Sequence, residues 1–291
     1  MASIGYLVLG LGLMPMIAGA EIRVVGSDLL GVELTPALRE FARRNDSAVT
    51  VAMSGSLSGW QDIQNDRADI GLLSFSPQES VPTDPYYAAA IAHHIVVVLA
   101  PDALSLHQVS FDQLSGVFGQ TDGSGWKRWS DLGVMGEAAG RSVIPHALVR
   151  SDSIQLELFR FEVLQSRPLD TGLKFDRTEA EMKRLWHDDA GGIALAAQMP
   201  LEGKGVRALS VSREAKGVAF LPTAPAVYRG DYPLQWPVYV VFRRAEVSRL
   251  YPLLRYLLGA EAAQVYEQAQ LLPIPVEARR DLLFGLERLE K

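Results

Sequence analysis

The sequence predicts an α/β protein built as two lobes, and three observations lead to this prediction. The chain has 291 residues, and the roughly 270 that follow an apolar leader suit two lobes of ordinary size. Apolar residues make up 48% of the chain and charged residues 21%, so it can bury a sizeable core. Segments patterned as strands alternate with segments patterned as helices, which is typical of parallel α/β structure.

The alternation begins directly after the leader. Apolar runs typical of strands and amphipathic runs typical of helices follow one another. Strands are expected at 21–26, 48–54 and 68–75, and helices at 35–45 and 58–67. We expect the first helix to start with Thr35 as its N-cap and Pro36 in its first position, where the missing N–H of proline is harmless.

The same pattern continues to the end of the chain. Further strands are expected at 93–101, 142–150 and 237–244, and further helices at 110–118, 152–166, 178–186, 246–259 and 260–270. Thr178 and Glu181 are spaced as a capping box at the start of one of these helices. We find no internal repeat.

The first twenty residues resemble a signal peptide. They carry no charge, are apolar from Leu7 to Ile17, and end in Ala18-Gly19-Ala20, which fits a cleavage site. A basic segment before the apolar run is missing. An uncleaved membrane anchor and a misassigned start codon are therefore alternatives to the cleaved leader, which we favour because Gly10, Gly12 and Pro15 weaken a spanning helix.

Composition excludes several classes of function. The formal net charge is −6 and basic residues are not clustered with aromatic ones, so nucleic acid is not expected as a partner. Without cysteine there is no disulfide, thiolate metal site or cysteine nucleophile. The five histidines show no metal-ligand spacing, and we expect neither a metal nor a cofactor. The adjacent His93 and His94 are expected at a strand surface and at a satisfied core position.

Serine and glycine gather where four of the expected strands end. These segments are residues 26–28, 54–59, 74–77 and 150–153. In open α/β sheets this edge is where ligands bind. Helix starts offer unpaired N–H groups and a partial positive charge, glycine lets the backbone approach, and serine adds a donor. The pattern favours a site for a small anion, although turn and capping roles explain any one of these segments equally well.

Arg150 is the candidate cation for that site. It follows a strand and precedes a helix that begins with Ser151, Asp152 and Ser153. Its guanidinium could bind two oxygens of a tetrahedral anion while Asp152 holds it in place. The alternative is a surface arginine, with Asp152 or Ser153 capping the helix.

Enzymatic motifs are incomplete. Residues 55–59 have the spacing of a nucleophile elbow, but Leu57 stands at its centre and no histidine follows in a suggestive setting. Residues 26–31 lack the second glycine of a dinucleotide-binding loop. We therefore do not expect an enzyme.

In these segments the chain resembles the periplasmic phosphate-binding proteins of ABC transporters, a branch of the type II periplasmic binding proteins. The resemblance is collinear over nearly the whole chain after the leader. It covers residues 24–28, 41–45, 54–59, 68–77, 90–101, 111–133, 147–159, 190–196, 230–242 and 253–275.

The resemblance implies two α/β lobes joined by two crossing strands, which close over an anion. Lobe 1 would comprise residues 21–93 and 238–291, and lobe 2 residues 94–237. Carried over by position, Ser27, Ser56 and Ser58 would bind the anion from lobe 1, and Arg150 with Ser153 from lobe 2. The implied protein is a periplasmic, monomeric solute-binding protein that delivers phosphate to an ABC permease.

Two departures from the family pattern bear on the ligand. The Gly and Thr donors that usually follow the arginine are absent from residues 150–155, and Ser74 stands where phosphate-specific members carry an aspartate. Because a serine hydroxyl donates as readily as it accepts, we expect a weaker preference for phosphate over sulfate. Asp28, beside Ser27, is the candidate replacement for the missing carboxylate, with a capping role as its alternative. Sulfate or another oxyanion, and a sensor module that does not serve transport, remain alternative functions.

Overall fold

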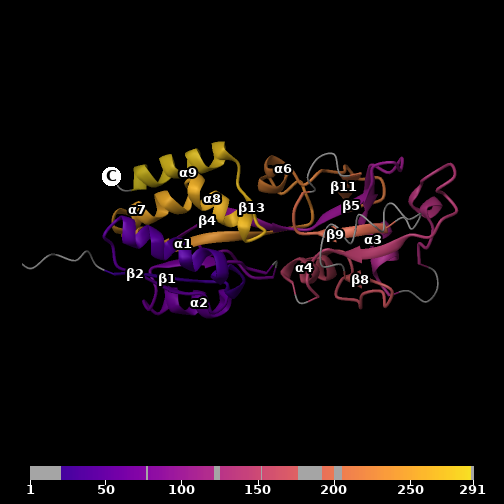
Figure 1. The fold of residues 1–291 in the computed structure, drawn as a ribbon. Coiled ribbons are helices and arrows are strands. Elements are labelled where there is room, and N and C mark those ends of the chain that lie inside the picture. The colour runs from indigo at the N-terminus through magenta and orange to yellow at the C-terminus, as the bar shows by residue number, and fades with distance from the viewer. Residues whose placement is uncertain are drawn as a thin grey trace, which may run out of the picture.

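The computed structural model describes residues 21–76, 78–120, 125–151, 153–175, 192–199 and 205–289. The chain forms two lobes, each with its own sheet and its own hydrophobic core. Figure 1 shows the N-terminal and C-terminal parts of the chain together in one lobe and the middle of the chain in the other. The expected signal peptide, the expected helix at 178–186 and Asp152 lie outside the described residues.

Lobe 1 contains a six-stranded sheet in the order β13-β4-β12-β3-β1-β2. The strands are β1 (Ile22–Gly26), β2 (Val49–Ala52), β3 (Ile70–Leu73), β4 (Tyr86–Ile95), β12 (Gln235–Arg243) and β13 (Leu272–Pro273). β1 is parallel to β2 and β3, whereas β12 is antiparallel to β3 and β4. The carboxyl ends of β1, β2 and β3 therefore lie at one edge of the sheet.

Helices cover both faces of this sheet. α1 (Gly31–Arg44), α7 (Val247–Leu257), α8 (Ala260–Gln268) and α9 (Val276–Leu289) share one large core with the sheet. α2 (Ser56–Gln64) packs through Ile63 against Val25 on the other face. Figure 1 accordingly shows α2 on the opposite side of the strands from α8 and α9.

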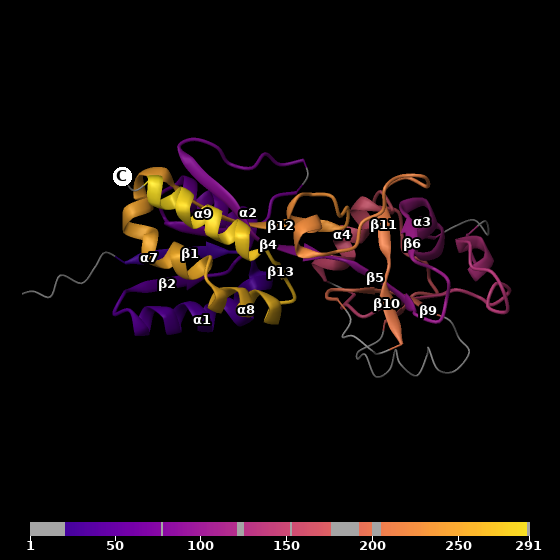
Figure 2. The same ribbon diagram turned by 90° about the horizontal axis from the view of Figure 1, so that it is seen from above.

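Lobe 2 contains a five-stranded sheet in the order β10-β5-β9-β7-β8. Its strands are β5 (Val97–Pro101), β7 (Ile144–Ala147), β8 (Lys174–Phe175), β9 (Gly192–Ala196) and β10 (Val206–Ala208), and β6 (Gln108–Ser110) pairs separately with β11 (Ser210–Ser212). Its helices are α3 (Phe111–Phe118), α4 (Ile154–Glu162) and α6 (Ala224–Tyr228). Trp129, Phe118 and Phe159 are completely buried in its core. Figure 2 shows α3 and α4 grouped in this lobe.

The two lobes are connected where β4 is followed by β5. Only Val96 separates the two strands, and its N–H donates to the Leu234 carbonyl at 3.0 Å. The hydroxyl of the buried Tyr232 donates to the Val96 carbonyl at 2.6 Å. Tyr232 and Leu234 lead directly into β12, which forms the second connection between the lobes. The two connections are therefore hydrogen-bonded to each other. At Val96 the chain passes from the six-stranded sheet of lobe 1 to the five-stranded sheet of lobe 2. The exact lobe limits expected from the sequence stay a prediction.

The first helix begins earlier than the sequence predicted. A short 3-10 helix at Asp28–Leu30 leads directly into α1, so the expected N-cap at Thr35 is wrong, and Pro36 lies inside the helix. The reason is burial: Leu30, Leu34 and Leu38 recur at helical spacing and are 1–2% exposed. The hydrogen bond that Pro36 cannot make would go to Val32, where the helix faces solvent.

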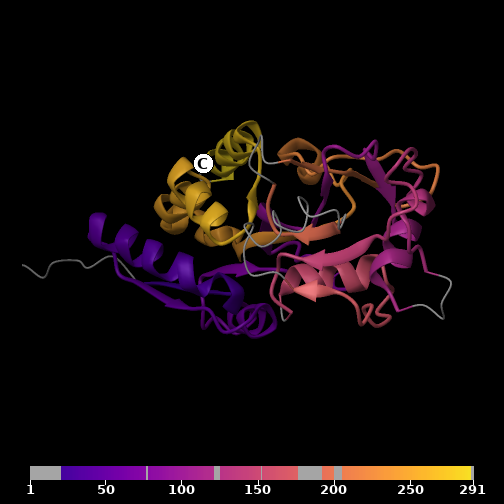
Figure 3. The same cartoon turned by 45° about the vertical axis from the view of Figure 1, so that its right-hand side comes forward.

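Several other boundaries differ. The expected strand at 93–101 is divided between β4 and β5, and β4 starts seven residues before His93, at Tyr86. The helix expected at 152–166 ends at Glu162. Among the described residues, no helix is long and apolar enough to cross a membrane. Figure 3 shows the indigo and yellow ends of the chain in lobe 1, with the magenta and orange segments beside them in lobe 2.

Candidate functional site

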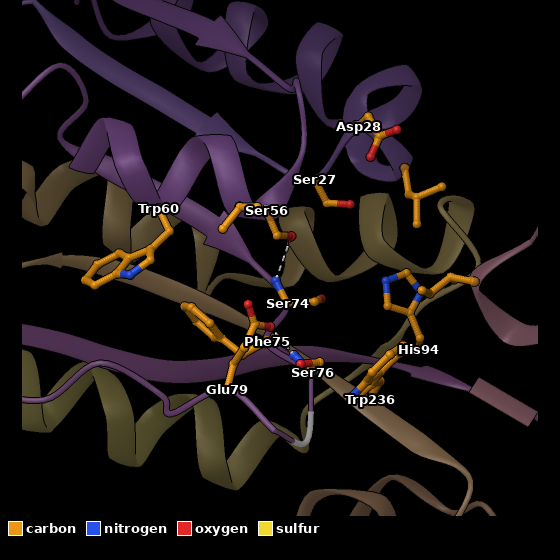
Figure 4. Close-up of a pocket in the computed structure, with 13 residues that line it drawn as sticks. Ser27, Asp28, Ser56, Trp60, Ser74, Phe75, Ser76, Glu79, His94 and Trp236 are labelled. Carbon is orange, nitrogen blue, oxygen red and sulfur yellow. Dashed lines mark hydrogen bonds between the residues drawn. The ribbon is translucent and has the colours of Figure 1, made fainter. Parts of the chain in front are cut away.

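A pocket of about 320 Å³ lies between the lobes. Lobe 1 contributes the segments that follow β1, β2 and β3, the crossing strands contribute His94 and Trp236, and α4 of lobe 2 contributes Ile154. The carboxyl edge of the parallel strands thus forms one wall of the pocket, as the sequence led us to expect. Figure 4 shows these side chains around the open space.

Ser27 lies at the carboxyl end of β1. Its N–H donates to the Leu72 carbonyl at 3.0 Å, which fixes the loop to β3, and its side chain makes no capping hydrogen bond. The residue is only 5% exposed, yet its hydroxyl points into the open space (Figure 4). Ser27 is the N-cap of the 3-10 helix Asp28–Leu30 that leads into α1, so it lies at the start of a helical segment whose first N–H groups lack partners within the helix.

Ser56 and Ser74 join the second and third loops. Ser56 is the first residue of α2, and its Oγ accepts the Ser74 N–H at 3.0 Å, as the dashed line in Figure 4 shows. Gly55 has φ 122°, a conformation that favours glycine, and its N–H donates to the Gly26 carbonyl at 2.9 Å. The Oγ of Ser74 is buried without a hydrogen-bond partner in the described structure.

Ser58, a predicted donor, does not line the pocket. Its hydroxyl donates to the Gly55 carbonyl at 3.0 Å, one turn back in the chain. A serine near a helix start commonly makes such a local bond, which explains why its pattern resembled that of a ligand-binding residue. The expectation that Ser58 faces the anion is therefore not supported by the geometry.

Carboxylates also line the pocket. Asp28 follows Ser27, and its side chain is exposed. Glu79 accepts the N–H of Ser76 through Oε2 at 2.7 Å. Among the described residues that line the pocket there is no lysine or arginine. The donors at this site are therefore hydroxyls, backbone N–H groups and ring nitrogens.

The described residues predicted from lobe 2, Arg150 and Ser153, do not line the pocket. Arg150 is exposed and does not line the pocket, although Ile154, four residues later, does. Ser153 is the N-cap of α4: its Oγ accepts the Leu156 N–H at 3.3 Å, and its own N–H donates to the Arg150 carbonyl at 3.1 Å. The capping alternative is thus what the structure shows for Ser153.

His94 is a pocket residue that the sequence analysis missed. Both His93 and His94 are 3% exposed, so the expectation of a strand surface was wrong, because β4 is flanked by β12 and β13 and covered on both faces. The ring of His94 lines the pocket and faces the hydroxyls of Ser27 and Ser74 (Figure 4). Its Nδ1 is buried without a partner in the described structure. The expected satisfied core position is therefore not satisfied.

Burial determines the charge of this ring. Loss of water, together with the smaller influence of the neighbouring His93, lowers the pKa of His94 to about 4. Burial also lowers the pKa of His93 to about 4. The ring is therefore neutral at pH 7 and offers one N–H donor and one acceptor. Because a buried N–H without a partner is rarer than a buried acceptor without one, we place the proton on Nε2 and the lone pair on Nδ1.

Aromatic rings form the remaining walls, and sequence reasoning missed them too. Trp60 follows the segment 54–59 directly, Phe75 lies within the segment 74–77, and Trp236 comes from β12. The Nε1 of Trp236 is buried without a partner in the described structure. The signal that could have found Trp60 and Phe75 was their position within two residues of Ser58 and Ser74.

The arrangement can bind a small group rich in oxygen. Hydroxyls, helix N-termini and a neutral imidazole surround one space, and such donors stabilise an oxyanion without formal positive charge. Among the described residues there is no cluster of histidine and carboxylate side chains that could hold a metal ion.

The fold has solved counterparts. A possible phosphate binding protein from Planctomyces limnophilus aligns with a TM-score of 0.68 at 18% identity, over 94% of this chain and 99% of that one. An ABC-type phosphate transport receptor from Vibrio cholerae aligns with 0.63 at 14%, over 88% and 100%. PstS from Borrelia burgdorferi aligns with 0.65 at 14%, over 88% and 99%.

No family model and no curated protein matches the sequence. The structural similarity nevertheless covers each solved chain almost completely. The chain therefore has the type II periplasmic binding protein fold, with two α/β lobes joined by crossing strands, as the sequence predicted. The similarity in fold is to phosphate-binding proteins of ABC transporters.

Proposed function

We propose that this protein is a periplasmic solute-binding protein that captures a tetrahedral oxyanion between its lobes and delivers it to an ABC permease. Phosphate is the leading candidate, because two of the solved counterparts are described as a possible phosphate binding protein and an ABC-type phosphate transport receptor. The chain acts as a monomer in this proposal, without a cofactor and without catalysis.

One observation carries the proposal. The hydroxyls of Ser27 and Ser74 and the ring of His94 face one space beside two helix N-termini, and Ser74 Oγ has no hydrogen-bond partner in the described structure. Buried polar groups are normally hydrogen-bonded, so a group of them left unpaired around a pocket favours an external partner. An oxyanion would accept hydrogen bonds from all three.

Isothermal titration calorimetry with phosphate tests the proposal. We expect Ser27→Ala to weaken phosphate binding roughly ten- to a hundredfold, because it removes one hydrogen bond to a charged group. Ser58→Ala is the matched control, since that hydroxyl bonds to Gly55 outside the pocket. Equal affinities for the two variants would contradict the placement of the site, and no binding by the parent chain would contradict the oxyanion proposal.

Ligand capture would draw the lobes together. Ile154 at the start of α4 lines the pocket, and Arg150 lies four residues before it in the chain; a small rotation about the crossing strands would bring the start of α4 closer to an anion held by lobe 1. Small-angle X-ray scattering should then give a smaller radius of gyration with saturating phosphate. An unchanged radius with confirmed binding would mean that the pocket is preformed.

Sulfate is the runner-up, and Asp28 distinguishes it from phosphate. Phosphate keeps a proton at neutral pH and sulfate has none, so a carboxylate near the anion accepts from the one and repels the other. Asp28 lines the pocket, whereas Ser74 offers a hydroxyl. We expect Asp28→Asn to reduce the ratio of phosphate to sulfate affinity in competition titrations. A ratio that stays high in this variant would mean that the proton acceptor lies elsewhere.

A further inference from the structure

Part of the pocket wall is apolar, and an inorganic ion would make no favourable contact with it. The donors Ser27, Ser74 and His94 lie around one part of it. Besides the polar Asp28, Ser56, Ser76 and Glu79, the rest of the described lining is apolar or aromatic and consists of Leu29, Leu57, Trp60, Phe75, Ile154 and Trp236. Walls of this kind, with a few polar groups placed among them, are typical of sites for organic ligands.

The size of the pocket, like the apolar character of its walls, fits an organic ligand. Its volume of about 320 Å³ is at the lower end of the range for small-molecule pockets, well above the space that one tetrahedral ion fills. The aromatic walls are held by neighbours: Trp60 packs edge-on against Phe75 at 6.2 Å and Tyr86 at 4.9 Å, and Trp236 stacks on Phe161 at 6.3 Å. These rings are therefore not free to swing inward and fill the space.

Leucine side chains stand beside the anion donors. Leu29 and Leu57 each lie within two residues of a predicted serine donor and are 45% and 65% exposed. Exposed apolar side chains that gather at one cleft mark a binding surface rather than ordinary scatter. They would be covered either by an apolar part of the ligand or by the opposite lobe when the cleft closes.

The charges at the pocket favour a ligand whose anionic head group carries a single charge. Its described lining includes the carboxylates of Asp28 and Glu79 and no basic side chain. A doubly charged anion would face both carboxylates with only neutral donors to balance it, whereas a singly charged one meets half that repulsion. The neutral His94 and the two serines can satisfy three oxygens of such a head group.

We propose that the preferred ligand is an organic oxyanion: a singly charged tetrahedral head, phosphonate or sulfonate, that carries a short apolar substituent. The head lies against Ser27, Ser74 and His94, and the substituent lies between Leu29, Leu57 and the tryptophan rings. This inference rests on the proposed function, because it places the same kind of head group at the same donors and adds the substituent.

Calorimetric titration at pH 7 with phosphate, methylphosphonate, propylphosphonate and propanesulfonate tests the inference. Each methylene that becomes fully buried should tighten binding by about fourfold, so propylphosphonate should bind more than tenfold tighter than methylphosphonate. Phosphate should bind more weakly than propylphosphonate. The comparison of propylphosphonate with propanesulfonate identifies which head the site prefers.

The variant Leu57→Ser tests whether the apolar substituent contacts Leu57. It should reduce the advantage of propylphosphonate over methylphosphonate. Val32→Ser is the matched control, because Val32 is 78% exposed on α1 and does not line the pocket. A propyl group that brings no gain, or a gain that survives Leu57→Ser, overturns the inference and means that the leucines seal the closed cleft. Failure of phosphate and all organic anions to bind would instead overturn the proposed function itself.

Discussion

Strands β1 and β3 have two ends that are built in opposite ways. At their amino ends, Asp69 accepts from the guanidinium of Arg23 at 3.0 Å and 3.1 Å and from Arg249 at 2.7 Å, and it also accepts the Arg23 N–H at 2.7 Å. At the edge formed by their carboxyl ends, Ser74 Oγ after β3 and His94 Nδ1 on β4 are buried without partners in the described structure.

The difference separates stability from function within one pair of strands. Burial alone would raise the pKa of Asp69, but the hydrogen bonds from Arg23 and Arg249 outweigh it and lower that pKa. The carboxylate is therefore more stable in the folded chain than in the unfolded one. The carboxyl ends instead keep groups whose hydrogen bonds are incomplete, which opposes folding. Of these, the hydroxyl of Ser74 can donate to a bound anion.

The largest expected effect is a loss of stability in mild acid that comes from the pocket end. The pKa values of His93 and His94 are about 4 in the folded chain, against about 6.5 when unfolded. Because the unfolded chain takes up protons first, stability is complete above about pH 6.5 and falls until about pH 4, by on the order of 3 kcal/mol for each ring. Urea unfolding between pH 7 and pH 4 measures it.

A variant of His94 shows how much of this acid effect comes from the histidine that lines the pocket. His94→Gln should reduce the loss of stability between pH 6.5 and pH 4 by about half, because only His93 then titrates there. A pH profile that is flat in the parent chain over this range would show that these rings are not buried in their neutral form.

The next effect comes from the opposite end of the strands. Asp69→Asn should destabilise the chain by about 3 kcal/mol at pH 7, because it leaves two arginines without their carboxylate. The lowered pKa of Asp69 means that its contribution is present above about pH 4 and is lost only as pH falls further. Asp66→Asn is the control: its carboxylate is 76% exposed, and its pair with Arg243 should be worth less than about 1 kcal/mol.

Phosphate binding should not follow the loss of stability in Asp69→Asn. Asp69→Asn should leave phosphate affinity at its parental value, measured under conditions in which the variant is folded. A large loss of affinity in the folded variant would mean that the two ends of the strands are coupled, and that stability and binding are not separate here.

The smallest effect on stability is expected at Ser74. Ser74→Ala removes a buried hydroxyl that has no partner in the described structure, so the free energy of unfolding should change by less than about 1 kcal/mol, and in the stabilising direction. Phosphate affinity should fall by about tenfold. Urea unfolding and calorimetry on the same sample measure both. A clear loss of stability would show that the hydroxyl serves the fold.

The sequence was informative about the parallel half of lobe 1. Because parallel strands bring their carboxyl ends to one edge, the serines after β1, β2 and β3 could be placed together before the structure was known. Ser27, Ser56 and Ser74 do line the pocket. Ser58 does not, because a bond to its own helix start competes for its hydroxyl.

The residues that could not be predicted depend on long-range packing. His94 and Trp236 lie on β4 and β12, which pair in the antiparallel direction across more than a hundred residues of chain. A histidine within an apolar strand gives no sign of which neighbours it will face. The ion pair between Asp69 and Arg249 likewise joins positions 180 residues apart, and no local pattern indicates it.

The central claim is that an oxyanion accepts hydrogen bonds from the donors that face the pocket, the hydroxyls of Ser27 and Ser74 and the Nε2–H of His94. Nitrogen-15 NMR of the histidine side chains tests it most directly, with His94→Gln to assign the resonance. We expect added phosphate to shift the Nε2 signal of His94, which lines the pocket, and to leave the signals of His93 in place, since that ring does not. A His94 signal that stays unchanged at saturating phosphate would contradict the claim.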